Sequence, residues 1–296
     1  LPDYPTPNGM AIDEYFRFSS YEGLKDRLAH LYPDTAKREV ERSRYEERLE
    51  FEINTILKMG FPGYFLIVGD FINWAKNNGC PVGPGRGSGA GSLVAYSLKI
   101  TDLDPLQYNL LFERFLNPER VSMPDFDIDF SWTDRDAVFD YLFTKYNKGE
   151  DAHVALLGSY STFQYNSVIR ELGKVFGLPK AEIESLLQQA DKADYRPDGL
   201  GKLILRYAQV LHDMPSHLTI HACGLLLSHK SMHYYTATNL PPKGFPVAHI
   251  DMHVAEDIGL HKFDLLSQRG LGHIKSSLEL IQKNQGITVN IREVKK

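Results

Sequence analysis

The stretch MPDFDIDF, Met123 to Phe130, has an aspartate at every second position from Asp125 and an apolar residue after each one. In a β-strand, successive side chains point to opposite faces, so Asp125, Asp127 and Asp129 would share one face and the apolar residues the other. Carboxylates placed side by side repel one another and raise each other's pKa unless a positive charge lies between them. A hard divalent cation such as Mg²⁺ binds carboxylate oxygens, and the pattern therefore predicts a metal site.

Two other structures share this acidic pattern. An edge strand with a solvent-facing acidic stripe is one, although aspartate is a poor strand former and the preceding Met-Pro pair fixes the entry to the strand. A calcium loop of the D-x-D-x-D-G type is the other. It requires glycine at the sixth position, where this chain has Phe130.

A second unusual stretch, GPGRGSGAGS, runs from Gly83 to Ser92 and is followed by helix-forming residues. Glycines leave backbone N–H groups unobstructed, and the N-terminus of a helix favours anions. Arg86 adds a guanidinium suited to paired hydrogen bonds, and Ser88 adds a hydroxyl. We expect this loop to hold a phosphate at the start of a helix.

The glycine loop also has alternative interpretations. It lacks the Lys-Ser/Thr pair of a Walker loop, and a purely structural turn is possible. Its match to the dinucleotide pattern G-x-G-x-x-A is weak, because a helix precedes it and the nearby acids, Asp102 and Asp104, lie in a turn-like TDLDP.

Composition limits the class of protein. The chain has 296 residues, 43% of them hydrophobic, enough for a large core, and no apolar run long enough to span a bilayer, so no membrane partner is expected. Two cysteines, Cys80 and Cys223, are too few for a disulfide framework and fit a reducing cytoplasm. The net charge of -5 argues weakly against nucleic-acid binding, although the distribution of charge matters more than its sum.

Hydrophobic periodicity predicts an α/β domain interrupted by a helical insertion at roughly residues 155–215. We expect a first helix capped by Ser19 or Ser20, and then a long, charged, solvent-exposed helix that ends at Gly60. A buried helix would end at Gly79. Further helices are predicted from Thr133 or Asp134 to Tyr146 and from about Gln268 to Asn284, with strands at HVALLGSY, CGLLLSH, PVAHID and GLHKFDLL.

A phosphate loop and a carboxylate metal site in one α/β unit indicate metal-dependent phosphoryl or nucleotidyl transfer. A further carboxylate is available at Asp264, in GLHKFDLL, with Lys262 two residues earlier on the same face.

The run from Gly83 to Phe130 closely resembles the alpha subunits of bacterial DNA polymerase III, the family C DNA polymerases. The resemblance extends over essentially the whole chain, including LPDYPTPNGM, MGFPGYFLIVGDF and HKFDLL. It implies a polymerase-beta-like nucleotidyltransferase palm with an inserted helical thumb. The implied domains are 1–154 (palm, first part), 155–215 (thumb), 216–267 (palm, second part) and 268–296 (start of the fingers).

The resemblance also implies roles for single residues. It identifies Asp125, Asp127 and Asp264 as the catalytic and metal-binding triad, whereas Asp129 lies outside it. The implied nucleotide-binding residues are Gly87, Ser88, Arg114 and Lys262, with Arg86 and Arg120 as helpers on local chemistry. The implied cofactors are two Mg²⁺ ions, for which Mn²⁺ can substitute.

The implied reaction is addition of deoxynucleotides to a primer 3′-hydroxyl in chromosomal replication. The implied partners are primer-template DNA, with Arg170 and Lys174 as candidate contacts, dNTP and, for the full-length protein, the sliding clamp and other replisome subunits in the cytoplasm. The chain has no PHP domain, complete fingers, clamp motif or OB domain, so the fragment alone is expected to be weakly active or inactive.

Some alternatives stay open. LLSQRGLGHI, Leu265 to Ile274, departs from the family pattern after the third aspartate, as does Ile220 where a lysine is usual, so a divergent copy acting in error-prone synthesis is one alternative. A non-catalytic nucleic-acid-binding module and a Rossmann-type dinucleotide enzyme are alternatives of another class.

Overall fold

The computed structural model describes residues 1–119, 123–149, 151–190, 192, 194–197 and 199–291. Within these, a six-stranded mixed sheet has the order β1-β6-β3-β2-β5-β4. The strands are β1 (Asp127–Ser131), β2 (Val154–Thr162), β3 (Pro215–Leu227), β4 (Thr238–Asn239), β5 (Val247–Ala248) and β6 (His261–Gln268). The chain is thus a mixed α/β protein, as the sequence predicts.

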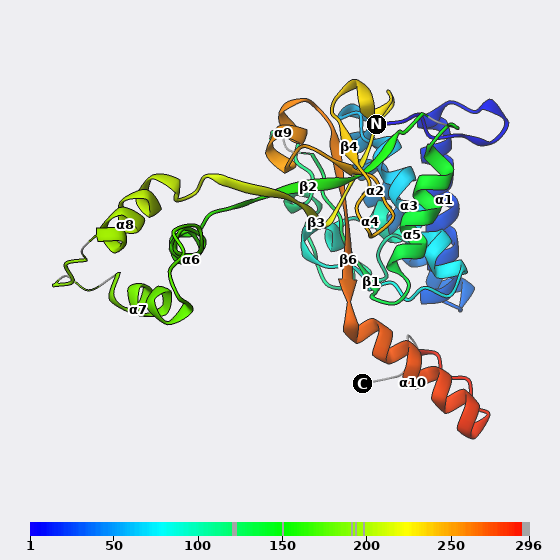
Figure 1. Cartoon of the computed structure of the whole chain (residues 1–296). Coiled ribbons are helices and arrows are strands. Elements are labelled where there is room, and N and C mark those ends of the chain that lie inside the picture. The colour runs from blue at the N-terminus through cyan, green and yellow to red at the C-terminus, as the bar shows by residue number, and fades with distance from the viewer. Residues whose placement is uncertain (120–122, 150, 191, 193, 198, 292–296) are drawn as a thin grey trace.

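Helices pack beside this sheet and extend from it (Figure 1). The α-helices are α1 (Ile12–Leu31), α2 (Thr35–Lys58), α3 (Pro62–Asn77), α4 (Leu93–Ser97), α5 (Arg135–Tyr146), α6 (Tyr165–Val175), α7 (Lys180–Ala190), α8 (Gly199–Leu211), α9 (Met252–Asp257) and α10 (Arg269–Gln285). Short 3₁₀-helices are η1 (Pro7–Gly9), η2 (Gly87–Gly91), η3 (Phe112–Arg114) and η4 (Met232–Tyr234).

The two faces of the sheet have different coverings. One face packs Phe263 and Leu265 of β6 and Ile128 and Phe130 of β1 into the main core, together with α1 to α5. The other face carries a smaller apolar cluster towards β2 and β5, to which Ala255 of α9 and Leu260, just before β6, belong. Since side chains alternate along a strand, the aspartates of β1 and β6 lie on this second face.

Strands β2 and β3 form a long antiparallel ribbon that leaves the body and carries α6, α7 and α8 at its far end (Figure 1). These helices have a separate apolar cluster that includes Val168, Ile169 and Ile204. They lie within the expected insertion of residues 155–215, but β2 continues to Thr162 before the first of them begins.

The prediction for the first helix is wrong at its start. Helix α1 begins at Ile12 after Ala11, which makes no capping hydrogen bond, and Ser20 lies inside it. The Ser20 hydroxyl is buried and donates to the Phe16 carbonyl one turn earlier, a bond that satisfies a serine within a helix. A serine before an apolar periodic run therefore did not mark an N-terminus here.

The predicted ends of the second and third helices are confirmed, and the start of α2 is capped by a side chain. Asp34 caps α2 by accepting the Lys37 N–H. Gly60 and Gly79 follow α2 and α3 with φ of 77° and 72°, the left-handed region that glycine adopts without strain.

Helix α2 is more than the solvent-exposed helix expected from its charge. One side of it is buried, and Glu52 on that side has no exposed surface. Regarding membranes, no single described helix is long and apolar enough to cross a bilayer; α2 and α3 meet that criterion only together, as a pair bent by 114°.

Candidate active site

Within MPDFDIDF the strand begins at Asp127, as the start of β1, and the alternation of apolar and acidic side chains between core and solvent runs from Asp125 to Phe130. Phe126, Ile128 and Phe130 are all buried, whereas the intervening aspartates reach solvent. The Phe126 N–H donates to the Tyr64 hydroxyl of α3 at 3.0 Å, and the two rings stack with centroids 5.9 Å apart. This anchor fixes the entry to β1 between Asp125 and Asp127.

Parallel pairing of β1 with β6 brings the distant third carboxylate to the first two. Asp127 and Asp264 are direct register partners. Adjacent strands lie about 4.8 Å apart, so same-face side chains at one level are neighbours. The predicted triad of Asp125, Asp127 and Asp264 is therefore assembled at one end of the sheet.

Lys262 lies between the carboxylates of Asp125 and Asp264. Its Nζ contacts Asp264 Oδ2 and lies 3.4 Å from Asp125 Oδ2. Burial opposes the charge of Lys262, but its contacts with Asp264 and Asp125 hold its pKa above the ordinary value. Burial raises the pKa of Asp125, as do the charges of Asp264 and Asp127, while Lys262 opposes the shift. The site therefore favours a cation over three free negative charges.

The glycine loop lies directly against these carboxylates. A Cβ at Gly87 would lie 3.8 Å from Asp127 Oδ2, and its φ of 64° is one that glycine adopts without strain. Arg86, Gly87 and Ser88 are exposed at the start of η2. Arg86 is 3.8 Å from both Asp127 Oδ2 and Asp129 Oδ1. Loop and strand thus form one continuous site.

The expectation that a helix N-terminus holds the phosphate is wrong for α4. Glu52 of α2 already occupies that end, accepting the Leu93 and Val94 N–H groups, each at 3.0 Å. It also accepts the Ser92 hydroxyl at 2.9 Å and pairs with Arg48 at 2.6 Å. The N–H groups left for a ligand are those of the exposed turn before α4.

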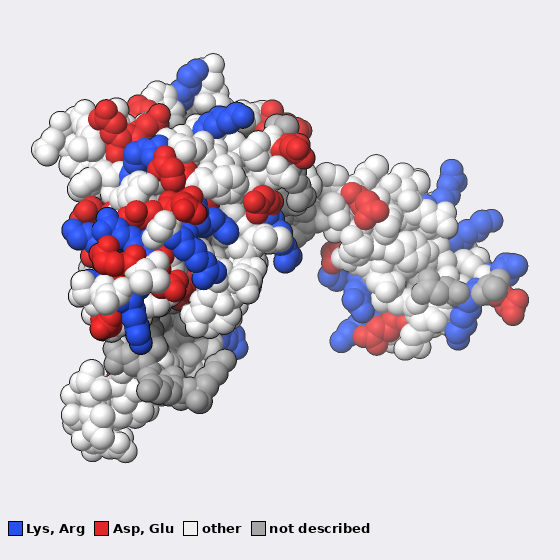
Figure 2. All heavy atoms as spheres, turned by 180° about the vertical axis from the view of Figure 1, so that it is seen from behind, with Lys and Arg blue, Asp and Glu red and all other residues white. Residues whose placement is uncertain are grey.

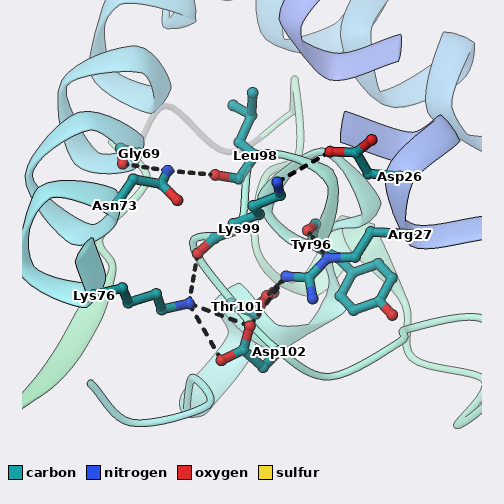
Figure 3. Close-up of polar contacts among 10 residues, drawn as sticks. All are labelled: Asp26, Arg27, Gly69, Asn73, Lys76, Tyr96, Leu98, Lys99, Thr101 and Asp102. Atoms are coloured by element: carbon teal, nitrogen blue, oxygen red, sulfur yellow. Dashed lines mark hydrogen bonds and ion pairs between the residues drawn. The ribbon is translucent and has the colours of Figure 1, made fainter. Parts of the chain in front are cut away.

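A polar network around Asp102 (Figure 3) lies against the start of the glycine loop. Arg27 of α1 and Lys76 of α3 both pair with the Asp102 carboxylate, at 3.0 and 3.2 Å. The Asp102 backbone N–H donates to the Pro84 carbonyl at 2.8 Å. A Cβ at Gly85 would lie 2.7 Å from the Thr101 side chain, so the loop sits tightly on this segment. Asp102 is thus engaged by two cations.

The Rossmann interpretation does not fit this geometry. The loop follows α3 rather than a parallel strand and leads into a 3₁₀ turn and the five-residue α4. Asp102, one of the two candidate acids for a ribose, is already paired, and the other, Asp104, accepts the Tyr45 hydroxyl at 2.6 Å.

Arg114, an expected nucleotide contact, forms no ion pair with the described carboxylates. It lies exposed at the end of η3, and among the described residues it makes no hydrogen bond or ion pair. Arg120 falls outside the described residues.

Cys223 is a site residue that sequence reasoning did not identify. Its Sγ lies 3.4 Å from Asp264 Oδ1, on the side away from Lys262. Burial raises the pKa of this thiol to about 12, helped by the Asp264 charge, so the thiol donates to the carboxylate. No motif indicated it, because its approach to Asp264 depends on β3 pairing with β6.

A cavity of about 380 Å³ lies elsewhere, between α1, α3 and α5. Its walls include Trp74 and Tyr141, which stack with centroids 4.5 Å apart. Its carboxylate, Asp70, is taken by Lys145 and the Tyr141 hydroxyl, both at 2.7 Å. The cavity therefore offers no open charge comparable to that of the triad.

Comparison of the sequence with known proteins places the chain in a family. Residues 14–267 match the family model described as the bacterial DNA polymerase III alpha NTPase domain. The chain is 45% identical to a DNA polymerase III subunit alpha of Neisseria meningitidis serogroup A over 98% of its length and 27% of that protein's. It is 44% identical to the Pseudomonas aeruginosa subunit and 43% to that of Escherichia coli K12, over 96% of its length and 26% of theirs in each case.

The chain thus spans about a quarter of the length of these curated relatives. The match to the family model covers most of the chain and contains the acidic strand, the glycine loop and Asp264. The chain belongs to the bacterial DNA polymerase III alpha family.

Proposed function

We propose that this chain is the palm and thumb of a template-directed DNA polymerase acting in chromosomal replication. The sheet with α1 to α5 would be a palm of the polymerase-beta-like type, and the helices on the ribbon its thumb. The observation that carries the proposal is the shared register of Asp127 and Asp264, with Lys262 between Asp264 and Asp125, beside an open glycine loop.

The donor atoms suit the proposed cofactor. Carboxylate oxygens are the ligands that Mg²⁺ and Mn²⁺ prefer, and Asp125, Asp127 and Asp264 supply them from one end of the sheet. When bound there, two such ions would supply activation of the primer 3′-hydroxyl and neutralisation of the triphosphate charge. Lys262 occupies part of this space as a cation, so we expect its ammonium to turn to a phosphate oxygen when metal binds.

The chain's own residues position the nucleotide. The exposed N–H groups of Gly87 and Ser88 would bind phosphate oxygens, and Arg86 would add paired hydrogen bonds once released from Asp127. Because Gly87 has no side chain, the loop leaves room for a phosphate beside the Asp127 carboxylate when a cation lies between the two anions. The expected reaction is the transfer of a deoxynucleotide from dNTP to a primer 3′-hydroxyl.

The proposed thumb would hold the primer-template duplex through its phosphates. Residues 163–213 contain seven Lys or Arg and seven Asp or Glu, so attraction cannot come from net charge. Figure 2 shows basic side chains around the outer edge of this unit. Local pairs such as Arg170 with Lys174 on α6, or Lys202 with Arg206 on α8, are the proposed contacts. A sliding clamp and other replisome subunits are the partners proposed for the full-length protein, in the cytoplasm.

Metal-dependent nucleotide binding tests the proposal. The chain would be titrated with Mn²⁺, with and without a dNTP, while free Mn²⁺ is followed by electron paramagnetic resonance. We expect Asp125→Asn with Asp127→Asn to weaken Mn²⁺-dependent dNTP binding by about tenfold or more, since two hard ligands are lost. Asp136→Asn, an exposed carboxylate on α5, is the matched control and should bind like the unmodified chain. Unchanged binding in the double variant would overturn the proposal.

A further inference from the structure

We propose that His221, Cys223 and Asp264 form a binding site for a thiophilic divalent cation of the zinc class. Their ligand atoms lie within 4.8 Å of one another, and the three residues come from two neighbouring strands. The site adjoins the proposed magnesium site and shares one carboxylate with it. Binding of a zinc-class cation here does not depend on the proposed polymerase activity. The expected weakening of Mg²⁺ binding at the triad does rest on that proposed function.

The distances suit such a cation. Cys223 Sγ is 3.4 Å from Asp264 Oδ1 and 3.8 Å from His221 Nδ1. With Zn–S bonds of about 2.3 Å and Zn–N or Zn–O bonds of about 2.1 Å, neighbouring ligand atoms of a tetrahedral site lie about 3.5 Å apart. Two of the three pairs are therefore near the required separation before any cation binds. Three protein ligands leave a fourth position for water.

The backbone presents these groups through an irregularity in β3. The ladder with β2 pairs Leu156 with Leu225 and Gly158 with Ile220, so residues 221–223 lie outside the regular register. Arg135 of α5 donates to the Ala222 carbonyl at 2.9 Å and to that of Leu265 at 3.5 Å, which holds this bulge beside β6. The bulge is thus held against Asp264, while residues 221–223 have no ladder partner to lose.

The imidazole turns the Nδ1 lone pair into the bulge. His221 Nδ1 accepts the Gly224 N–H at 2.9 Å and the Cys223 N–H at 3.4 Å, which assigns the proton to Nε2. A cation would take this lone pair in place of the two N–H groups. Both His221 and Cys223 are partly exposed, so a cation can enter from solvent.

The chemistry separates this site from the carboxylate triad. A thiolate and an imidazole select softer cations such as Zn²⁺, whereas carboxylates alone suit Mg²⁺. Binding replaces the thiol proton of Cys223, which leaves to solvent as the metal–sulfur bond forms, with no change in oxidation state. Asp264 would bind this cation through Oδ1, the oxygen that faces Cys223, while Oδ2 faces Lys262. Zn²⁺ should consequently weaken Mn²⁺ binding at the triad.

Cobalt absorption tests the site directly, because Co²⁺ bound to a thiolate gives a sulfur-to-cobalt charge-transfer band in the near ultraviolet. We expect the chain to show this band on titration with Co²⁺ and to lose it when Zn²⁺ is added. Cys223→Ser should abolish the band. Cys80→Ser, which removes the other thiol, should retain it.

Alkylation of the unmodified chain gives a readout that needs no variant. Zn²⁺ should slow modification of Cys223 by iodoacetamide by about tenfold or more, measured by mass spectrometry of the Cys223 peptide, because the metal-bound sulfur is a poorer nucleophile. No cobalt–thiolate band, or a band that persists in Cys223→Ser, would overturn the proposal, as would unchanged alkylation. Mn²⁺ binding by the triad without added Zn²⁺ is measured separately, so failure of this site and failure of the proposed function are distinguishable.

Discussion

Asp127 of β1 and Asp264 of β6 are direct register partners in a parallel pair of strands, and Lys262 lies two residues before Asp264 on the same face. The ammonium group of Lys262 therefore competes with any metal ion that binds there for the carboxylate oxygens of Asp125 and Asp264. Substitution of Lys262 should therefore strengthen the binding of Mn²⁺ and weaken the binding of dNTP.

Lys262→Met should lower the free energy of unfolding by about 2–4 kcal/mol without metal, since Asp264 is 7% exposed and loses its counter-charge. Mn²⁺ should bind several-fold more tightly, because its competitor is gone, whereas dNTP should bind more weakly. Calorimetric titration and urea denaturation measure these changes. Lys58→Met, exposed at the end of α2, is the control. Mn²⁺ affinity that falls together with dNTP affinity would show that Lys262 supports the metal.

Arg86 is shared by two carboxylates, and Asp129 Oδ1 is buried without a hydrogen-bond partner. In Asp129→Asn, Arg86 would pair only with Asp127. Because it would then compete more strongly for the Asp127 carboxylate, Mn²⁺ binding should weaken by about three- to tenfold at low salt. The double variant Asp129→Asn with Arg86→Ala should recover most of this loss. A double-mutant cycle on Mn²⁺ affinity is the measurement, and purely additive effects would refute the coupling.

Glu52 should be a main contributor to stability in α2. Glu52→Ala leaves the Leu93 and Val94 N–H groups and Arg48 without their partner in a buried position, at a cost of about 3 kcal/mol or more. Glu52→Gln should cost less because its amide oxygen still accepts. Urea denaturation would measure both. Glu47→Ala, exposed on the same helix, should stay within about 0.5 kcal/mol of the unmodified chain. If Glu52→Ala lowered the free energy of unfolding by no more than Glu47→Ala does, Glu52 would not stabilise the protein by capping α4.

His261 should make stability depend on pH. Burial lowers its pKa from 6.5 to about 4, so the unfolded chain binds this proton more tightly than the folded one. Its contribution is fully present above pH 6.5 and is lost as pH falls towards 4, by about 2 kcal/mol after allowance for partial exposure. His261→Gln should remove this part of the pH dependence in urea denaturation. His253 is an exposed histidine, and His253→Gln should show the same pH dependence of the free energy of unfolding as the unmodified chain.

Sequence periodicity was sufficient for the acidic strand and for the α/β class. The alternation of Asp125 to Phe130 fixed which face is buried, because a strand allows only two faces and the apolar residues decide between them. The proximity of Asp264 followed from its strand pattern and the family resemblance, and the structure confirms it.

Features that depend on distant contacts could not be predicted. Glu52 appeared as one more charge on a charged helix, and only the position of α4 shows that it caps a neighbour. No sequence motif indicates a role for Cys223, because its distance to Asp264 depends on the register of β3 with β6. The start of α1 was misplaced because Ser20 bonds back to its own helix.

The parallel pairing of β1 with β6 also bears on how the protein is made. Asp264 follows the whole ribbon and its helices in the chain, so a ribosome must release nearly the entire segment before the third carboxylate can reach the first two. Non-local pairing of this kind is slow to form, whereas α6, α7 and α8 can pack around their own apolar cluster beforehand. The nascent chain would therefore complete its helical tip first and acquire the ability to bind metal last.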